Sequence, residues 1–148
     1  MSATMDRRAQ VHVYSVHAIH PFHAVMLAAT LPLFLGALLS DWAYWRTHEI
    51  QWANFSSWLI AGALVFGAVA LLFAVFGLFA RRGRGGRRSL YLLLLLAMWV
   101  LGFINALAHA KDAWAVMPMG LLLSVIVALL AIAATWVGFS TLRSEMVS

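Results

Sequence analysis

The chain has 148 residues, of which 64% are hydrophobic and only 10% are charged, and its mean hydropathy is +0.91. A soluble globular domain carries about a quarter charged residues, and a domain of this size has too much surface for its volume to hide so many apolar side chains from water. A soluble enzyme, a disordered tail and a free nucleic-acid binder are excluded, which leaves an integral membrane protein.

Four long stretches of the chain contain no Asp, Glu, Lys or Arg, and each is longer than the ~20 residues that a helix needs to cross about 30 Å of hydrocarbon. These stretches are residues 9–40, 51–80, 89–110 and 113–142. They are apolar throughout rather than at alternate positions, which favours helices over barrel strands. The expected spans are 22–40, 54–79, 90–108 and 117–139. Short connections between them predict one all-α membrane domain over residues 1–148, an up-down-up-down four-helix bundle.

Basic residues are concentrated in the loop 80–89, between the second and third expected spans. Cytoplasmic loops carry an excess of Lys and Arg, so this loop and both termini are predicted to be cytoplasmic. That orientation leaves only Arg46 and Lys111, of ten basic residues, on the outer side. Five of the seven tryptophans then fall toward the outer face, where indole favours the headgroup layer. They are Trp42, Trp45, Trp52, Trp58 and Trp114.

Small residues recur at four-residue spacing inside the expected spans, as Ala63 does with Gly67 and Gly102 with Ala106. Helices associate in lipid by close backbone approach at such positions. We expect these faces to pack helix against helix within the chain, and the alternative is a homo-oligomer. Pro32 lies inside the first span and removes a backbone donor, which predicts a kink or local loosening there.

Three of the six histidines, His17, His20 and His23, recur at every third residue around the start of the first span. Imidazole is a good ligand for metals and for haem iron, so these residues are the candidate cofactor-binding site, and haem b is the cofactor considered for them. One segment seldom places three imidazoles around one metal, so a capping or headgroup-contacting role is favoured, no bound cofactor or metal is predicted, and haem b binding is the alternative. The absence of cysteine excludes disulfides, thiolate metal sites and iron–sulfur clusters.

A second group of polar residues is expected at the outer mouth of the bundle. Asn105 and His109 are four residues apart and share one face of the third span. Asp41 ends the first span at a similar depth, and polar groups that face a bundle interior are the usual functional candidates in a membrane protein. The predicted polar outer cluster is Asp41, Asn105, His109 and Asp112, with His48 and Glu49 nearby. The alternative is an ordinary wet helix end in which Asn105 hydrogen-bonds a neighbouring helix.

Several short motifs together resemble one known family. They are Val16-His17-Ala18-Ile19-His20-Pro21, Leu31-Pro32-Leu33, Ser40-Asp41-Trp42-Ala43-Tyr44-Trp45-Arg46-Thr47, Trp114-Ala115-Val116-Met117-Pro118-Met119-Gly120-Leu121 and Leu123-Ser124. The chain resembles, over nearly its whole length, a bacterial predicted-membrane-protein family catalogued as domain of unknown function 2231. The resemblance implies a four-helix protein of the bacterial inner (plasma) membrane without an established activity.

The resemblance also implies a histidine–proline pair before the first span, which His17 and His20-Pro21 match. Family members often carry a further histidine and asparagine early in the third span, where this chain has only Leu92 to Leu96, and a basic, histidine-bearing tail that Leu142-Arg143-Ser144-Glu145 does not match. A haem or metal site built from those histidines is therefore expected to be incomplete here. Some relatives sit beside genes for periplasmic sugar dehydrogenases, which implies a role beside a partner protein.

The leading functional prediction is a non-enzymatic membrane anchor or accessory subunit in the lipid bilayer, with a partner at the periplasmic face such as a periplasmic redox enzyme. It rests on spans without mid-membrane charge and on the Trp-rich outer loops, and no nucleic-acid partner is expected. Two alternatives stay open. One is a b-type haem or metal-binding redox subunit that uses the N-terminal histidines, and the other is a small transporter or channel with a polar mouth at Asp41, Asn105 and His109.

Overall fold

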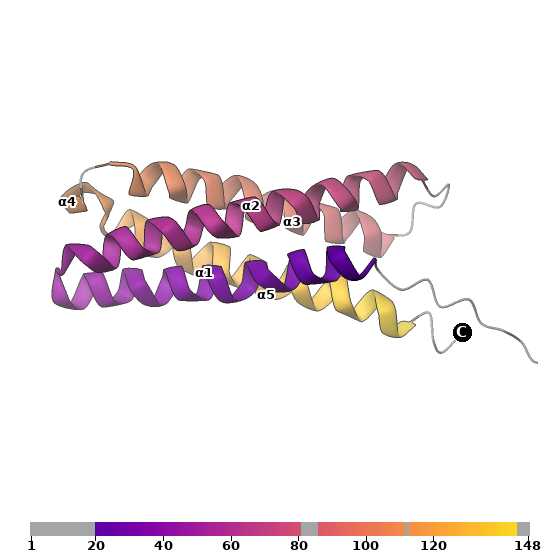
Figure 1. The fold of residues 1–148 in the computed structure, drawn as a ribbon, viewed down its shortest axis with the longest axis horizontal. Helices are drawn as coiled ribbons and strands as arrows, with labels where there is room; N and C mark the ends of the chain where they lie inside the picture. The colour runs from indigo at the N-terminus through magenta and orange to yellow at the C-terminus, as the bar shows by residue number, and fades with distance from the viewer. Residues whose placement is uncertain (1–19, 81–85, 112, 145–148) are drawn as a thin grey trace, which may run out of the picture.

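A computed structural model describes residues 20–80, 86–111 and 113–144, and the regular structure in these ranges is helical throughout (Figure 1). The four long helices are α1 (Pro21–Thr47), α2 (Ile50–Ala80), α3 (Gly86–His109) and α5 (Met119–Ser144), and a single turn, α4 (Ala113–Val116), precedes α5. Each long helix is long and apolar enough to cross a membrane. The predicted all-α class with four membrane-length helices is confirmed.

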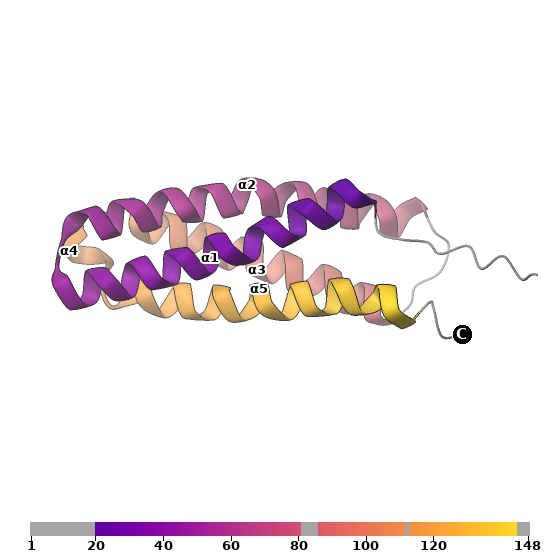
Figure 2. The ribbon, with the colours of Figure 1, turned by 60° about the horizontal axis from the view of Figure 1, so that its bottom comes forward.

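The four long helices form a ring in which each packs against two others. Helix α1 contacts α2 and α5, and α3 contacts the same two helices from the opposite corner. Consecutive long helices run in opposite directions, so the α1–α2 connection and α4 lie at one end of the bundle (Figures 1 and 2). We call this the α1–α2 end. The start of α1, the end of α2, the start of α3 and the end of α5 lie at the other end, which we call the α2–α3 end.

Local sequence signals account for both ends of α1. Pro21 occupies the first turn, where its missing N–H costs no hydrogen bond, and the Nδ1 of His20 accepts from the Phe22 N–H at 3.3 Å. The helix ends at Thr47, and the following residue, His48, adopts a left-handed conformation (φ 58°) and donates its N–H to the Tyr44 carbonyl at 2.8 Å. Helix α1 continues through Pro32 without interruption. It also extends seven residues past the expected span 22–40. Asp41, the first residue after that span, is buried inside the bundle, so the buried face of the helix continues past it.

Small residues let the helices approach closely in the middle of the bundle. Ala63, Ala70, Ala131 and Ala134 are fully buried. A Cβ placed on Gly102 would lie 3.1 Å from the Phe34 ring. The small residues of the expected packing faces are therefore used inside the chain, around a core of larger side chains from all four long helices. That core includes Leu27, Phe34, Ile60, Leu95, Met98 and Val127.

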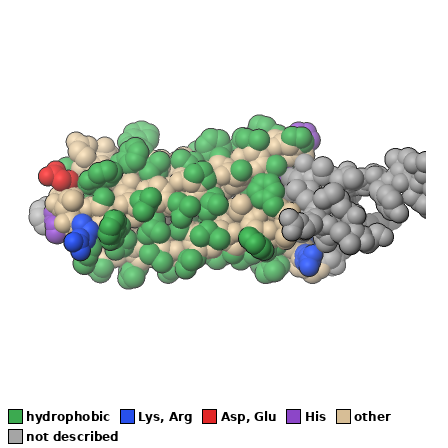
Figure 3. Space-filling model, turned by 90° about the horizontal axis from the view of Figure 1, so that it is seen from below, with side chains coloured by type: hydrophobic (Ala, Val, Ile, Leu, Met, Phe, Trp, Pro, Cys, Tyr) green, Lys and Arg blue, Asp and Glu red, His purple; other side chains and the backbone are tan. Residues whose placement is uncertain are grey.

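The outer surface of the bundle is apolar over most of its length. On the face in Figure 3, hydrophobic side chains cover the middle, and charged side chains appear only near the two ends. Leu39, Val65, Leu129 and Trp136 are all more than 60% exposed. Water would penalise so large an apolar surface, whereas the hydrocarbon of a bilayer is a matching solvent for it.

Candidate functional site

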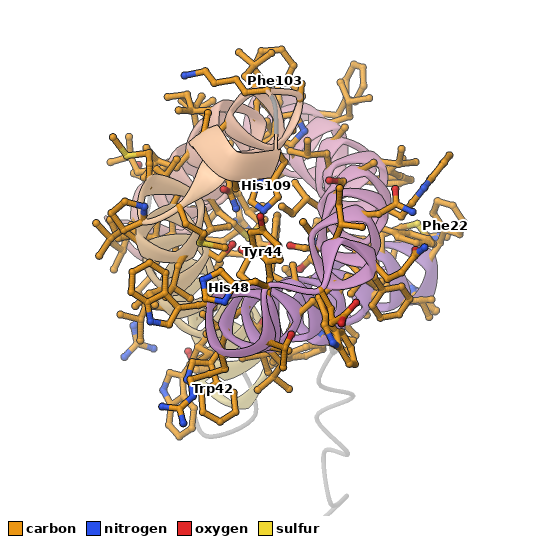
Figure 4. All side chains as sticks on the ribbon, turned by 90° about the vertical axis from the view of Figure 1, so that its left-hand side faces the viewer. Phe22, Trp42, Tyr44, His48, Phe103 and His109 are labelled. Atoms are coloured by element: carbon orange, nitrogen blue, oxygen red, sulfur yellow. The ribbon has the colours of Figure 1, made fainter. Side chains whose placement is uncertain are left out.

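Five buried polar side chains meet near the α1–α2 end, and we call them the polar cluster. They come from all four long helices: Asp41 from α1, Ser56 from α2, Asn105 and His109 from α3, and Ser124 from α5. Four of them are at most 2% exposed, and His109 is 9% exposed. Figure 4 looks along the bundle from this end and shows His109 in the middle of the helix ring, with Tyr44 beside it.

The Asp41 carboxyl group is the centre of the hydrogen bonds in the polar cluster. Its Oδ1 lies 2.8 Å from the Nε2 of His109. Its Oδ2 accepts from the Ser124 hydroxyl at 2.5 Å. Ser124 in turn accepts from the side-chain amide of Asn105, with an Nδ2–Oγ distance of 2.8 Å. Helices α1, α3 and α5 are thus connected through one carboxyl group.

The orientation of the His109 ring follows from its other nitrogen. Nδ1 lies 2.9 Å from the Asn105 carbonyl oxygen, and a carbonyl only accepts, so Nδ1 carries a proton. The Ser56 Oγ is 3.4 Å from Nε2, and the Ser56 hydroxyl donates to the Ala37 carbonyl at 3.2 Å. Ser56 therefore presents a lone pair toward Nε2 and adds α2 to the polar cluster.

Space for the imidazole comes from a glycine at the start of α5. A Cβ on Gly120 would lie 2.9 Å from the Cε1 of His109 and 2.6 Å from a methyl group of Val116. Both distances are shorter than real side chains tolerate, so any larger residue would displace the ring or Val116. Gly120 and the turn α4 thereby close the polar cluster from the side of α5.

Hydrogen bonds between the members of the polar cluster lower the free-energy cost of burying the Asp41 carboxyl group. A lone carboxylate moved from water into the interior costs several kcal/mol, and a partner with good geometry offsets much of that cost. Both oxygens of Asp41 and both nitrogens of His109 have partners. The one unpaired atom in the polar cluster is the Oδ1 of Asn105, which is buried without a donor.

Three residues of the polar cluster were predicted from the sequence, and two were not. The structure brings Asp41, Asn105 and His109 together, and the Asn105 amide does bond to a neighbouring helix. His48 and Glu49 are exposed on the connection after α1, and Asp112 lies outside the described residues. Ser56 and Ser124 were not expected in the cluster. Their only signal is a hydroxyl within an apolar helix at the depth of Asp41, Asn105 or His109.

Two of the three candidate cofactor histidines, His20 and His23, lie at the α2–α3 end, away from the polar cluster. His17 falls outside the described residues. His20 caps α1, and His23 bonds through Nε2 to the Tyr91 hydroxyl at 2.8 Å. Both rings pack near Phe73, with centroids 6.1 and 5.8 Å away. The described residues contain no group of three or more His, Asp or Glu side chains placed to hold a metal ion.

Comparisons with known proteins give one match. The model of a family described as predicted membrane protein (DUF2231) matches residues 19–147. No curated protein and no solved structure matches the chain. The matched region contains all four long helices and every residue of the polar cluster. The chain therefore belongs to the DUF2231 family of predicted membrane proteins.

Proposed function

We propose that this chain is a non-enzymatic membrane anchor or accessory subunit that presents its α1–α2 end to a partner protein. The proposal rests mainly on the hydrogen bonds that the buried polar groups make with one another. Both oxygens of Asp41 and both nitrogens of His109 bond within the bundle, and the bonds of Asp41 reach α3 and α5. Groups paired in this way clasp helices together, whereas a catalytic base or nucleophile needs a free atom that faces a substrate.

Exposed aromatic side chains at the α1–α2 end support the position of the partner. Trp42, Trp45, Trp52 and Trp58 are between 42% and 73% exposed, and Phe55 is 54% exposed. Tryptophan anchors a helix at the headgroup layer and is also enriched at the centres of protein interfaces. The partner that fits the predicted orientation is a periplasmic protein such as a redox enzyme, which the clasped bundle would hold at the membrane.

Site-specific photo-crosslinking in the native host tests this proposal. A photoreactive residue replaces Trp52 or Trp58 at the α1–α2 end, and in matched controls it replaces Leu72 or Leu129, which are similarly exposed along the helices. We expect one discrete protein adduct from the first pair and lipid adducts alone from the second. Lipid adducts alone at all four positions, or one protein adduct pattern shared by all four, would contradict the proposal.

A further inference from the structure

The hydrogen bonds of His109 indicate how many protons its imidazole ring and the Asp41 carboxyl group hold between them. Because Nδ1 donates to the Asn105 carbonyl, a neutral imidazole has its lone pair at Nε2. That atom lies 2.8 Å from the Oδ1 of Asp41. Two lone pairs at this distance repel each other, so a further proton lies between Nε2 and Oδ1. The lone pair that Ser56 directs at Nε2, 3.4 Å away, matches an N–H at this position.

Loss of the shared proton would turn this contact from attractive to repulsive. A carboxylate oxygen would then face an imidazole lone pair in an interior where electrostatic interactions are stronger than in water. Gly120 packs against the ring and the Asn105 carbonyl holds Nδ1, so the ring has little room to turn away. The nearest relief is separation of α1 from α3 at the α1–α2 end.

The buried pair lies close to the end of α1, where residues 45–49 are exposed. Tyr44 lies one turn after Asp41 on α1 and is 5% exposed. Its ring is 6.4 Å, centroid to centroid, from that of the exposed His48. Seen along the bundle from this end, His109 and Tyr44 lie inside the helix ring and His48 lies toward its edge (Figure 4). Only the last turns of α1 therefore separate Asp41 from the exposed residues that follow.

Few other titratable groups of the described residues lie near the pair, and Asp112, which follows Lys111, is outside the described residues. Helix α1 contributes the buried Tyr44 and the exposed Arg46, and the exposed His48 and Glu49 follow it. Exposed Lys111 follows α3. Helix α2 contains no titratable side chain, α4 contains none, and the basic residue of α5, Arg143, belongs to the far end of that helix. Among the described residues, the acidic and basic side chains buried at this end are Asp41, His109 and Tyr44.

We propose that Asp41 and His109 form a proton-binding site open to the α1–α2 end, and that the proton they share keeps the four helices together at this end. Release of the proton separates the ends of α1 and α3, and rebinding closes them. The inference is independent of the partner proposed above, because it concerns only contacts within this chain. A partner that docks at the α1–α2 end would nevertheless encounter a surface whose shape depends on proton occupancy.

Paired spin labels test the proposal on the full chain in lipid nanodiscs. The chain has no cysteine, so Glu49→Cys and Lys111→Cys place two labels at exposed sites after α1 and after α3. The distance distribution is measured by pulsed electron resonance from acidic to strongly alkaline pH. We expect a narrow distribution that loses its short-distance population over one single-proton transition. A distribution that does not change with pH would overturn the proposal.

Two variants assign the transition to the pair. Asp41→Asn keeps a donor toward Nε2 and an acceptor for Ser124 but carries no titratable proton, so the labels should stay close at every pH. His48→Gly removes the exposed imidazole and suits the left-handed backbone at that position, so the transition should persist. An unchanged transition in Asp41→Asn, or its loss in His48→Gly alone, would overturn the assignment.

A measurement without any substitution at Asp41 keeps the test valid if Asp41→Asn does not fold. The ring nitrogens of ¹⁵N-histidine distinguish protonated from lone-pair states in magnetic resonance spectra. We expect one of the six histidines to change at Nε2 alone, in step with the loss of the short-distance population. If no histidine signal changes over that transition, the proton is not held by His109 and the proposal fails.

Discussion

Gly120 makes the polar cluster sterically possible, because its missing side chain leaves room for the His109 ring. A methyl group there would approach the ring to 2.9 Å and Val116 to 2.6 Å. We expect Gly120→Ala to lower the free energy of unfolding by about 1–3 kcal/mol, the usual cost of overpacking. Thermal unfolding in detergent, followed by circular dichroism, measures the change.

The matched control for this substitution is Gly62→Ala. A Cβ on Gly62 would make only ordinary contact, 3.7 Å from Leu33, and alanine favours the helix by about 1 kcal/mol. Gly62→Ala should therefore leave stability unchanged or raise it. Equal stability of the two alanine variants would show that the His109 ring does not fill the space beside Gly120.

His48 adopts a backbone conformation that suits glycine better than histidine. Its φ of 58° costs a side-chain-bearing residue roughly 1 kcal/mol relative to glycine. We expect His48→Gly to raise the unfolding free energy by about that amount, because the N–H of residue 48 still bonds to the Tyr44 carbonyl. Chemical unfolding in mixed micelles tests this. A less stable His48→Gly variant would mean that the imidazole makes contacts worth more than the backbone strain.

The two serines of the polar cluster could not be predicted from the sequence, because serine in an apolar helix has two common roles. Ser40 and Ser57 bond to carbonyls four residues earlier in their own helices, which is the common fate of serine in an apolar helix. Ser56 and Ser124 look the same in the sequence but bond across the bundle. The rotation of each helix about its axis decides whether a serine faces its own helix backbone or a neighbouring helix, and the sequence does not show that rotation. Asp41 was easier to predict, because its position at the end of the first expected span puts it at the depth of Asn105 and His109.

At the scale of the helices, hydropathy located four spans but not their ends. The first span was expected to end at Ser40, yet α1 continues to Thr47, because pairing with His109 keeps Asp41 inside the bundle. The single turn α4 was not expected at all. It is followed by a cis Met117–Pro118 peptide bond and by α5, whose Leu122 N–H bonds to the Pro118 carbonyl. Such turns depend on tertiary packing, which an apolar run does not encode.

Bonds between helices should matter more than bonds within one helix. Ser124→Ala removes the donor to the Oδ2 of Asp41 and the acceptor for Asn105, and leaving such buried groups unpaired costs about 1–3 kcal/mol. Ser57→Ala removes a bond to the same helix only and should change stability by less than about 0.5 kcal/mol. Denaturation of both variants in the same detergent provides the comparison. A Ser57→Ala variant as unstable as Ser124→Ala would argue against an interhelical clasp.

The whole molecule combines an apolar exterior with a polar cluster confined to one end. Because the helices alternate in direction, the α1–α2 connection and α4 share that end (Figure 2). The sequence predicts that this end faces outward, because basic residues are dense in the loop 80–89 and sparse elsewhere. The helix count and class followed from the apolar composition and from the four long stretches without charged residues. The close packing of α1 with α5 did not, since apolar runs carry little information about which helices are neighbours.

The accessibility of single cysteines from each side of a membrane tests most directly whether the four helices span it in the predicted orientation. Cysteine replaces Glu49, Lys111 or Arg84 in otherwise cysteine-free chains, and intact spheroplasts of an expression host are treated with a membrane-impermeant maleimide. With the predicted orientation, we expect labelling of the Glu49 and Lys111 variants in intact spheroplasts and of the Arg84 variant only after permeabilisation. Labelling of the Arg84 variant in intact spheroplasts, or of Glu49 and Lys111 from opposite sides, would contradict it.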